Sequence, residues 1–226
     1  MEHRDGRDTR WQEHRVERRA TLVDSALRAI RTHGAAVTVD EIALGSGTSK
    51  TVLYRYFGDR NGLYLAVADK VASNILSEVR PRFESLRESG EVADLVRGLA
   101  DAYIGLVDRD PDIYLFVMNR PPSLPAGAGD PATGIADRIA IELAEAIRDE
   151  QRRRGTSGGA VETLSFGIVG FIRTATGQWL SSGAGAVLPR AELIQLITST
   201  FTASVSDAVN GTSSPQRIGD LPAART

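Results

Sequence analysis

Apolar residues recur along most of the chain at the three- and four-residue steps of an amphipathic helix. The first predicted helix, over about 15–33, ends at Gly34 and carries an apolar face made of Val16, Ala20, Val23, Leu27 and Ile30. The same steps predict further helices over about 60–80 (stopping at Pro81), 91–108, from Pro111, 135–154, 160–182 and 189–209. No alternating pattern indicates a strand, so we predict an all-α protein.

Two shorter helices are expected between Gly34 and Gly58. Thr38 with Glu41 three residues later forms a capping box that begins the first helix, and Gly45 and Gly47 break it. Ser49 caps the second, over about 49–57. The inward-facing residues are expected to be Val39, Ile42, Ala43, Val52, Leu53 and Phe57. A longer helix followed by two short helices with a tight glycine-containing turn is the helix-turn-helix layout.

The second short helix leaves a polar, basic and aromatic set of side chains outside the predicted core. A recognition helix reads bases in the major groove with residues near its N-terminus, and the free N–H groups there attract a phosphate. The set consists of Ser49, Lys50, Thr51, Tyr54 and Arg55. A purely structural helical hairpin is the alternative interpretation of residues 38–57.

Composition narrows the remaining possibilities. Of the 226 residues, 42% are hydrophobic and 25% are charged, which is ordinary for a globular protein. The chain has no cysteine, no apolar run of transmembrane length and no secretory signal at its start, so we expect a cytoplasmic protein. The net charge is -2, but residues 1–80 carry 13 basic and 11 acidic side chains, whereas 81–226 carry 14 and 18. This mild asymmetry suits a DNA-binding head on an acidic body.

Catalytic and metal chemistry are disfavoured. The histidines are His3, His14 and His33, none at metal-ligand spacing, and residues 34–226 contain none that could serve a Ser-His-Asp triad. No phosphate-binding glycine motif occurs. We therefore expect no enzyme, no metal and no cofactor.

Residues 15–70 resemble the DNA-binding domain of TetR-type (tetracycline-repressor-like) regulators. The resemblance lies in Ser49-Lys50-x-x-Leu53-Tyr54-x-Tyr56-Phe57, in Asp59-Arg60-x-x-Leu63, and in the helix that ends Ala26-Leu27-x-x-Ile30-x-x-x-Gly34. It implies a three-helix helix-turn-helix head and a body of about six helices for ligand binding and dimerisation. The DNA contacts that it implies are Thr38, Ser49, Lys50, Thr51, Tyr54, Arg55, Tyr56 and Arg60. The chain departs from the family pattern at Leu44, Gly45 and Thr48; Leu44 is expected to be buried against the body.

The stretch 165–183 is the most informative part of the body. Its small residues permit close helix approach, and the resemblance implies a four-helix dimer interface with 189–209. Arg173 interrupts this apolar stretch, and a buried arginine needs a partner: a salt bridge within the body or across the dimer, or an anionic ligand. An apolar ligand pocket is predicted from Tyr103, Leu106, Tyr114, Val117, Met118, Phe166, Arg173 and Trp179.

The expected organisation is a disordered charged arm (1–14), a DNA-binding head (15–58), a body (59–209) and a disordered tail (210–226), with a loop over 121–134. The arm's arginines either follow DNA or belong to a solvated tail. The helix at 60–80 is expected to be the only element joining head to body. The predicted function is a one-component transcriptional regulator: a homodimeric repressor of a palindromic operator, released by a small lipophilic effector. The alternatives are an activator, an effector-independent regulator, or a helical carrier or enzyme.

Overall fold

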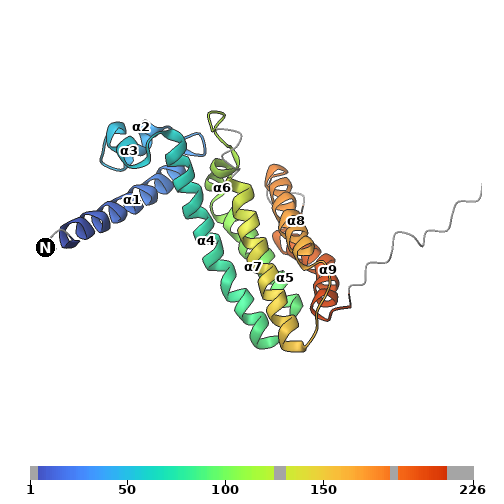
Figure 1. The fold of residues 1–226 in the computed structure, drawn as a ribbon. Coiled ribbons are helices and arrows are strands. Elements are labelled where there is room, and N and C mark those ends of the chain that lie inside the picture. The colour runs from blue at the N-terminus through green and yellow to red at the C-terminus, as the bar shows by residue number, and fades with distance from the viewer. Residues whose placement is uncertain (1–4, 125–130, 184–187, 213–226) are drawn as a thin grey trace, which may run out of the picture. The chain divides into compact units, whose positions relative to one another are not determined.

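The computed structural model of the chain describes residues 5–124, 131–183 and 188–212, and in these ranges all regular structure is helical (Figure 1). The prediction of an all-α fold is therefore confirmed. The helices are α1 (Asp5–His33), α2 (Val39–Gly45), α3 (Lys50–Phe57), α4 (Arg60–Ser89), α5 (Val92–Arg109), α6 (Pro111–Met118), α7 (Pro131–Arg154), α8 (Val161–Ser181) and α9 (Arg190–Val209). Their number agrees with three head helices and six body helices.

The contacts divide the chain into two compact units. The first comprises Met1–Ile75 with Leu106–Ile135, and the second comprises Leu76–Gly105 with Ala136–Thr226. The first unit thus includes α6 and the beginning of α4 as well as α1 to α3. The head boundary at residue 58 stays a prediction.

The first unit is built on side chains that α1, α2 and α3 contribute to one core. Leu22, Ile30, Ile42 and Leu53 are among the largest fully buried side chains. Burying each aliphatic side chain of this size contributes about 1.5 to 3 kcal/mol. Because α2 and α3 have seven and eight residues, too few for an isolated helix, this burial is what holds them.

Polar contacts connect α1 and the beginning of α4 to α6. Both oxygens of the Asp110 carboxylate accept hydrogen bonds from the Arg31 guanidinium, at 2.6 and 3.1 Å, and this bond raises the pKa of Arg31. The hydroxyl of Tyr64, only 2% exposed, donates to the Val117 carbonyl at 2.7 Å. The Arg31–Asp110 pair joins α1 directly to the start of α6, so the expectation that helix 60–80 is the only element joining the head to later elements is wrong.

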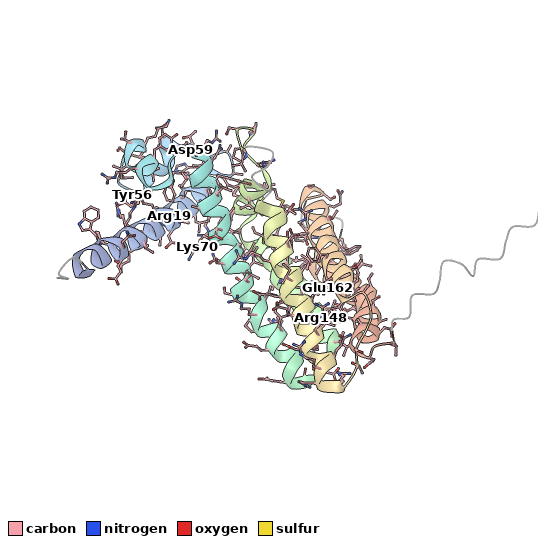
Figure 2. All side chains as sticks on the ribbon, in the orientation of Figure 1. Arg19, Tyr56, Asp59, Lys70, Arg148 and Glu162 are labelled. Carbon is pink, nitrogen blue, oxygen red and sulfur yellow. The ribbon has the colours of Figure 1, made fainter. Side chains whose placement is uncertain are left out.

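In the second unit, α4, α5, α7, α8 and α9 pack their apolar stripes together. Arg80 of α4 pairs with Glu142 of α7 at 2.9 Å. Arg148 of α7 and Glu162 of α8 form a further ion pair (Figure 2). Gln151, at the end of α7, donates to the Ala208 carbonyl at 2.7 Å. None of the helices in the described parts of the chain combines the length and the apolar character needed to cross a lipid bilayer.

Helix α1 is longer than the apolar pattern predicts. It begins at Asp5, so residues 5–14, expected to be a disordered arm, are helical, while residues 1–4 lie outside the described part. From Arg7 to Ala20 the sequence has no glycine or proline and is rich in strong helix formers, which explains the extension. Val16, expected on the apolar face, is 66% exposed because burial along α1 begins only at Leu22.

Two other helix boundaries differ from expectation. Helix α4 continues through Pro81 to Ser89, because Phe83 and Leu86, 5% and 1% exposed, extend its buried stripe and offset the hydrogen bond that proline removes. Helix α7 begins at Pro131, a favourable first helical residue, rather than near residue 135. The rest of the predicted 121–134 loop falls partly on residues 125–130, outside the described ranges, as does the predicted disordered tail beyond residue 212.

The buried Tyr64 hydroxyl gives a test of the link between α4 and α6. Tyr64→Phe should lower the free energy of unfolding by about 1 to 2 kcal/mol, because it leaves the Val117 carbonyl without this donor in an apolar site. Urea unfolding followed by circular dichroism measures the change. Tyr54→Phe is the matched control, since the Tyr54 hydroxyl has no hydrogen-bond partner among the described residues. Equal stability of the two variants would contradict the prediction.

Candidate nucleic-acid interface

Helix α2 begins with the predicted capping box. The Thr38 hydroxyl accepts a hydrogen bond from the Glu41 backbone N–H at 3.3 Å, and the Glu41 carboxylate accepts one from the Thr38 backbone N–H at 2.7 Å. The Thr38 hydroxyl also donates to that carboxylate at 2.8 Å. The bond from the Thr38 backbone is the main reason that the pKa of Glu41 lies below its ordinary value. The box fixes the first turn of α2 and places Thr38 at an exposed helix start.

A tight turn follows and then α3. Gly47 adopts a left-handed φ of 60°, a conformation that L side chains rarely adopt. Ser49 caps α3 as predicted, its hydroxyl accepting from the Val52 N–H at 3.3 Å. Gly58, with a φ of 82°, ends α3, and the Asp59 carboxylate accepts from the Gly62 N–H at 2.8 Å at the start of α4.

The inward-facing side of both short helices agrees closely with the prediction. Val39, Ile42, Ala43, Leu53 and Phe57 are buried, and Val52 is half-buried. Leu44, expected to be buried against the body, is instead 82% exposed. It lies on α2 directly after Ile42 and Ala43, which occupy the buried side, so its own side chain points away from the core.

The eight predicted DNA contacts all reach the surface of the first unit. Tyr54 and Tyr56 are half-buried, and the exposed members are Thr38, Ser49, Lys50, Thr51, Arg55 and Arg60. The Arg55 guanidinium lies 5.7 Å from the centre of the Tyr56 ring, so the two side chains form a cation–π pair at the end of α3. Their roles in contacting DNA stay predictions.

One of these cations is held by an acidic neighbour. The ammonium nitrogen of Lys50 lies 3.0 Å from a carboxylate oxygen of Asp40 on α2. Hydrogen bonding to Asp40 raises the pKa of Lys50, so the lysine stays fully charged near neutral pH. In the free protein Asp40 therefore competes with any phosphate for Lys50.

The eight predicted ligand contacts are divided between the two units. Tyr103, Leu106, Val117 and Trp179 are buried, Tyr114, Met118 and Arg173 are half-buried, and Phe166 is 43% exposed. The Trp179 indole N–H donates to the Leu188 carbonyl at 2.7 Å, which is a structural contact. The pockets described for this chain involve none of the eight side chains. The pocket assignment stays a prediction.

Arg173 was expected to be buried and to need a partner. It is only half-buried, because its place on α8 lies between the buried and the outward side and its long stem reaches solvent. Across the described ranges it has no ion pair or hydrogen bond. A salt bridge within the body is therefore not observed, whereas a partner across a dimer or an anionic ligand stays open.

Sequence reasoning missed the contacts that connect α1 and α4 to α6. The Arg31–Asp110 pair and the Tyr64–Val117 hydrogen bond join positions 79 and 53 residues apart, which no local pattern reveals. It considered Arg15 and Arg19 among the arginines that either follow DNA or belong to a solvated tail. It missed Trp11 and the four-residue steps that place Trp11, Arg15 and Arg19 on one side of α1.

Comparison with known proteins agrees with this geometry. The family described as "Bacterial regulatory proteins, tetR family" matches residues 22–67, which span the end of α1 from Leu22, all of α2 and α3, and the beginning of α4. The HTH-type transcriptional regulator Rv0472c of Mycobacterium tuberculosis is 34% identical over 221 residues, covering 96% of this chain and 90% of that protein. The chain belongs to the TetR family. The family consists of DNA-binding transcriptional regulators, so the helix-turn-helix of α2 and α3 is a DNA-binding element.

More distant similarities extend over most of the chain. The HTH-type transcriptional activator FasR of Mycolicibacterium smegmatis is 26% identical over 171 residues, covering 74% of each chain. The structure of the transcriptional regulator FadR from Bacillus subtilis in complex with stearoyl-CoA superposes with a TM-score of 0.61, at 14% identity, over 85% of this chain and 98% of that one. The latter similarity establishes the fold alone.

The Lys50–Asp40 pair predicts that Asp40 weakens DNA binding. Asp40→Asn should tighten binding by about threefold to tenfold at low salt, because it frees Lys50 and removes a negative charge beside α3. Fluorescence anisotropy with labelled DNA measures the affinity. Asp24→Asn is the matched control, because Asp24 faces Lys70 at 4.0 Å, away from α3. Weaker binding by Asp40→Asn would show that Asp40 helps to position Lys50 on DNA.

Proposed function

We propose that this TetR-family protein is a homodimeric repressor that binds a palindromic operator and releases it when a small lipophilic ligand binds to the body. The exposed side of α3 carries the proposal. Its first turn presents Ser49, Lys50 and Thr51 beside free backbone N–H groups, while Leu53 and Phe57 anchor the opposite side. Such an arrangement suits the entry of a helix N-terminus into the major groove.

The outward side of α8 supports dimerisation. One stripe of this side repeats at steps of four and three and consists of small residues: Thr163, Gly167, Gly170, Thr174, Gly177 and Ser181. A Cβ added at Gly167 or Gly170 would meet no atom within 4 Å in the monomer. Because the side chains of this stripe are small and uncharged, two copies of the helix can approach each other closely.

Helix α9 continues this surface. Leu196 is 50% exposed, and a groove of about 540 Å³ between α8 and α9 is lined by Gly167, Phe201 and Ser204 among others. Phe171 and Phe201 pack edge to face across the two helices, with ring centres 5.2 Å apart. The groove can receive side chains of a second copy, and Phe166, exposed on α8, suits the same interface.

Release by a ligand is supported by the fold and by a neighbour. FadR of Bacillus subtilis, which shares the fold, was crystallised with stearoyl-CoA. The buried aromatic and aliphatic side chains of the body, with Arg173 as a cation, favour an apolar ligand with an anionic group.

Activation is the second candidate function, because one relative, FasR, is an activator. Transcript levels of the regulated gene in a deletion strain separate repression from activation, since loss of a repressor raises them and loss of an activator lowers them.

Mass spectrometry of molecules that co-purify with the protein tests ligand binding. A protein that co-purifies with no molecule and releases no DNA with any fatty-acyl compound would contradict the proposed ligand.

The recognition helix predicts a specific loss of binding. Combining Tyr54→Ala with Arg55→Ala should weaken operator affinity by at least 100-fold, because it removes contacts from both half-sites of the dimer. A gel-shift assay against the DNA upstream of the protein's own gene measures this. Arg97→Ala, a surface change on α5, should leave the affinity unchanged. Unchanged binding by the double variant would overturn the assignment of α3.

The small-residue stripe of α8 predicts that a bulky charge breaks the dimer. Gly170→Arg should shift the protein from dimer to monomer and raise the dimer dissociation constant by roughly 100-fold, about 2.7 kcal/mol. Sedimentation velocity over a range of concentrations measures the change. Gly134→Arg on α7 is the matched control, because a Cβ at Gly134 also meets no atom within 4 Å. A Gly170→Arg protein that stays dimeric would exclude this interface.

A further inference from the structure

The helical extension at the start of α1 forms one wall of a pocket beside the end of α3. The pocket has a volume of about 250 Å³ and is lined by Trp11, His14 and Arg15 from α1 and by Arg55 and Tyr56 from α3. Two arginines, a histidine and two aromatic rings thus converge on one concave site. Two of these five, Arg55 and Tyr56, already belong to the predicted DNA-facing set; the α1 residues do not.

One and two turns beyond Arg15, contacts of α1 hold it in a fixed position relative to α3. The Arg19 guanidinium lies 5.2 Å from the centre of the Phe57 ring, and Leu22 is 1% exposed in the core of the first unit. Arg19 and Tyr56 lie on the neighbouring sides of α1 and α3 in Figure 2. With a rise of about 1.5 Å per residue, the extension carries Trp11 roughly 16 Å beyond Leu22 along the same helix.

The charges in this pocket are available to a ligand. Arg15 and Arg55 form no ion pair with any carboxylate of the described chain, and both are exposed. A carboxylate oxygen of Glu17 lies 4.0 Å from the Nδ1 atom of His14. Trp11 is 77% exposed, which leaves its indole ring accessible to a ligand.

We propose that this pocket binds a backbone phosphate and its deoxyribose just outside the half-site that α3 reads. Arg15 and Arg55 contact the phosphate oxygens, and the rings of Trp11 and Tyr56 pack against the sugar. Helix α1 then lengthens the DNA footprint of each subunit. The inference rests on the proposed DNA binding through α3, and it assigns Arg15 and Trp11 a role that a merely solvated arm would not have.

Substitutions of Arg15 and Trp11 should change DNA binding in different ways. Arg15→Ala should weaken operator affinity by about threefold to tenfold per half-site and reduce the slope of log affinity against log salt by about one, because one phosphate is no longer neutralised. Trp11→Ala should weaken affinity without changing that slope. Arg28→Ala, which removes an equal charge from an exposed position near the other end of α1, should change neither quantity. Far-UV circular dichroism verifies that each variant is folded.

A double-mutant cycle identifies the phosphate. Duplexes carrying the operator and its flanks are made with one flanking phosphodiester at a time replaced by a neutral methylphosphonate. At one flanking position the replacement should weaken wild-type binding and leave Arg15→Ala binding unchanged. Inorganic phosphate added at the concentration of the DNA phosphates should not compete, which separates a DNA site from a site for a free anion.

The outcomes distinguish this inference from the function on which it rests. If wild type and Arg28→Ala bind the operator and Arg15→Ala and Trp11→Ala bind it equally well, with the same salt slope and with no sensitive flanking position, the pocket is overturned and the role of α3 stands. If wild type shows no sequence-specific binding at low salt, both proposals fail. Competition by inorganic phosphate would overturn the assignment to DNA.

Discussion

The structure of the DNA-binding element depends on the burial of Leu53 and Phe57. Helix α3 has eight residues and would not persist in water on its own. It exists because Leu53 is fully buried and Phe57 is 8% exposed, with the Arg19 guanidinium over its ring. The same anchoring fixes which side faces outward. The polar first turn from Ser49 to Thr51 is presented because the opposite side is occupied.

Capping complements this burial at the places where burial is weakest. The Thr38–Glu41 box and the Ser49 cap satisfy backbone N–H groups at the starts of two very short helices. These are also the places where a phosphate approaches a helix N-terminus in the proposed complex. The residues that stabilise the free protein therefore lie where the proposed complex forms. In the free protein, Lys50 pairs with Asp40, a pairing that DNA would have to replace.

The connection from the head to α6 gives the regulatory proposal a physical basis. Arg31 with Asp110 and Tyr64 with Val117 couple α1 and α4 to α6 within one compact unit. A shift of α6 would break or strain these contacts, and breaking the buried Tyr64 hydrogen bond costs about 1 to 2 kcal/mol. That is comparable to the coupling free energies typical of allosteric regulators.

The sequence by itself determined the all-helical fold, the capped helix-turn-helix and the outward residues of α3, because all of these follow from local periodicity and from caps within four residues. It did not determine where α1 begins or that α4 continues through Pro81, since the first depends on a charged stretch without an apolar stripe and the second on the burial of Phe83 and Leu86. Only the tertiary structure placed Arg31 on Asp110, exposed Leu44, and brought Trp11 and Arg15 beside Arg55 and Tyr56. Contacts between residues dozens of positions apart depend on how helices pack, and helix packing is decided by the fit of whole surfaces rather than by any local pattern.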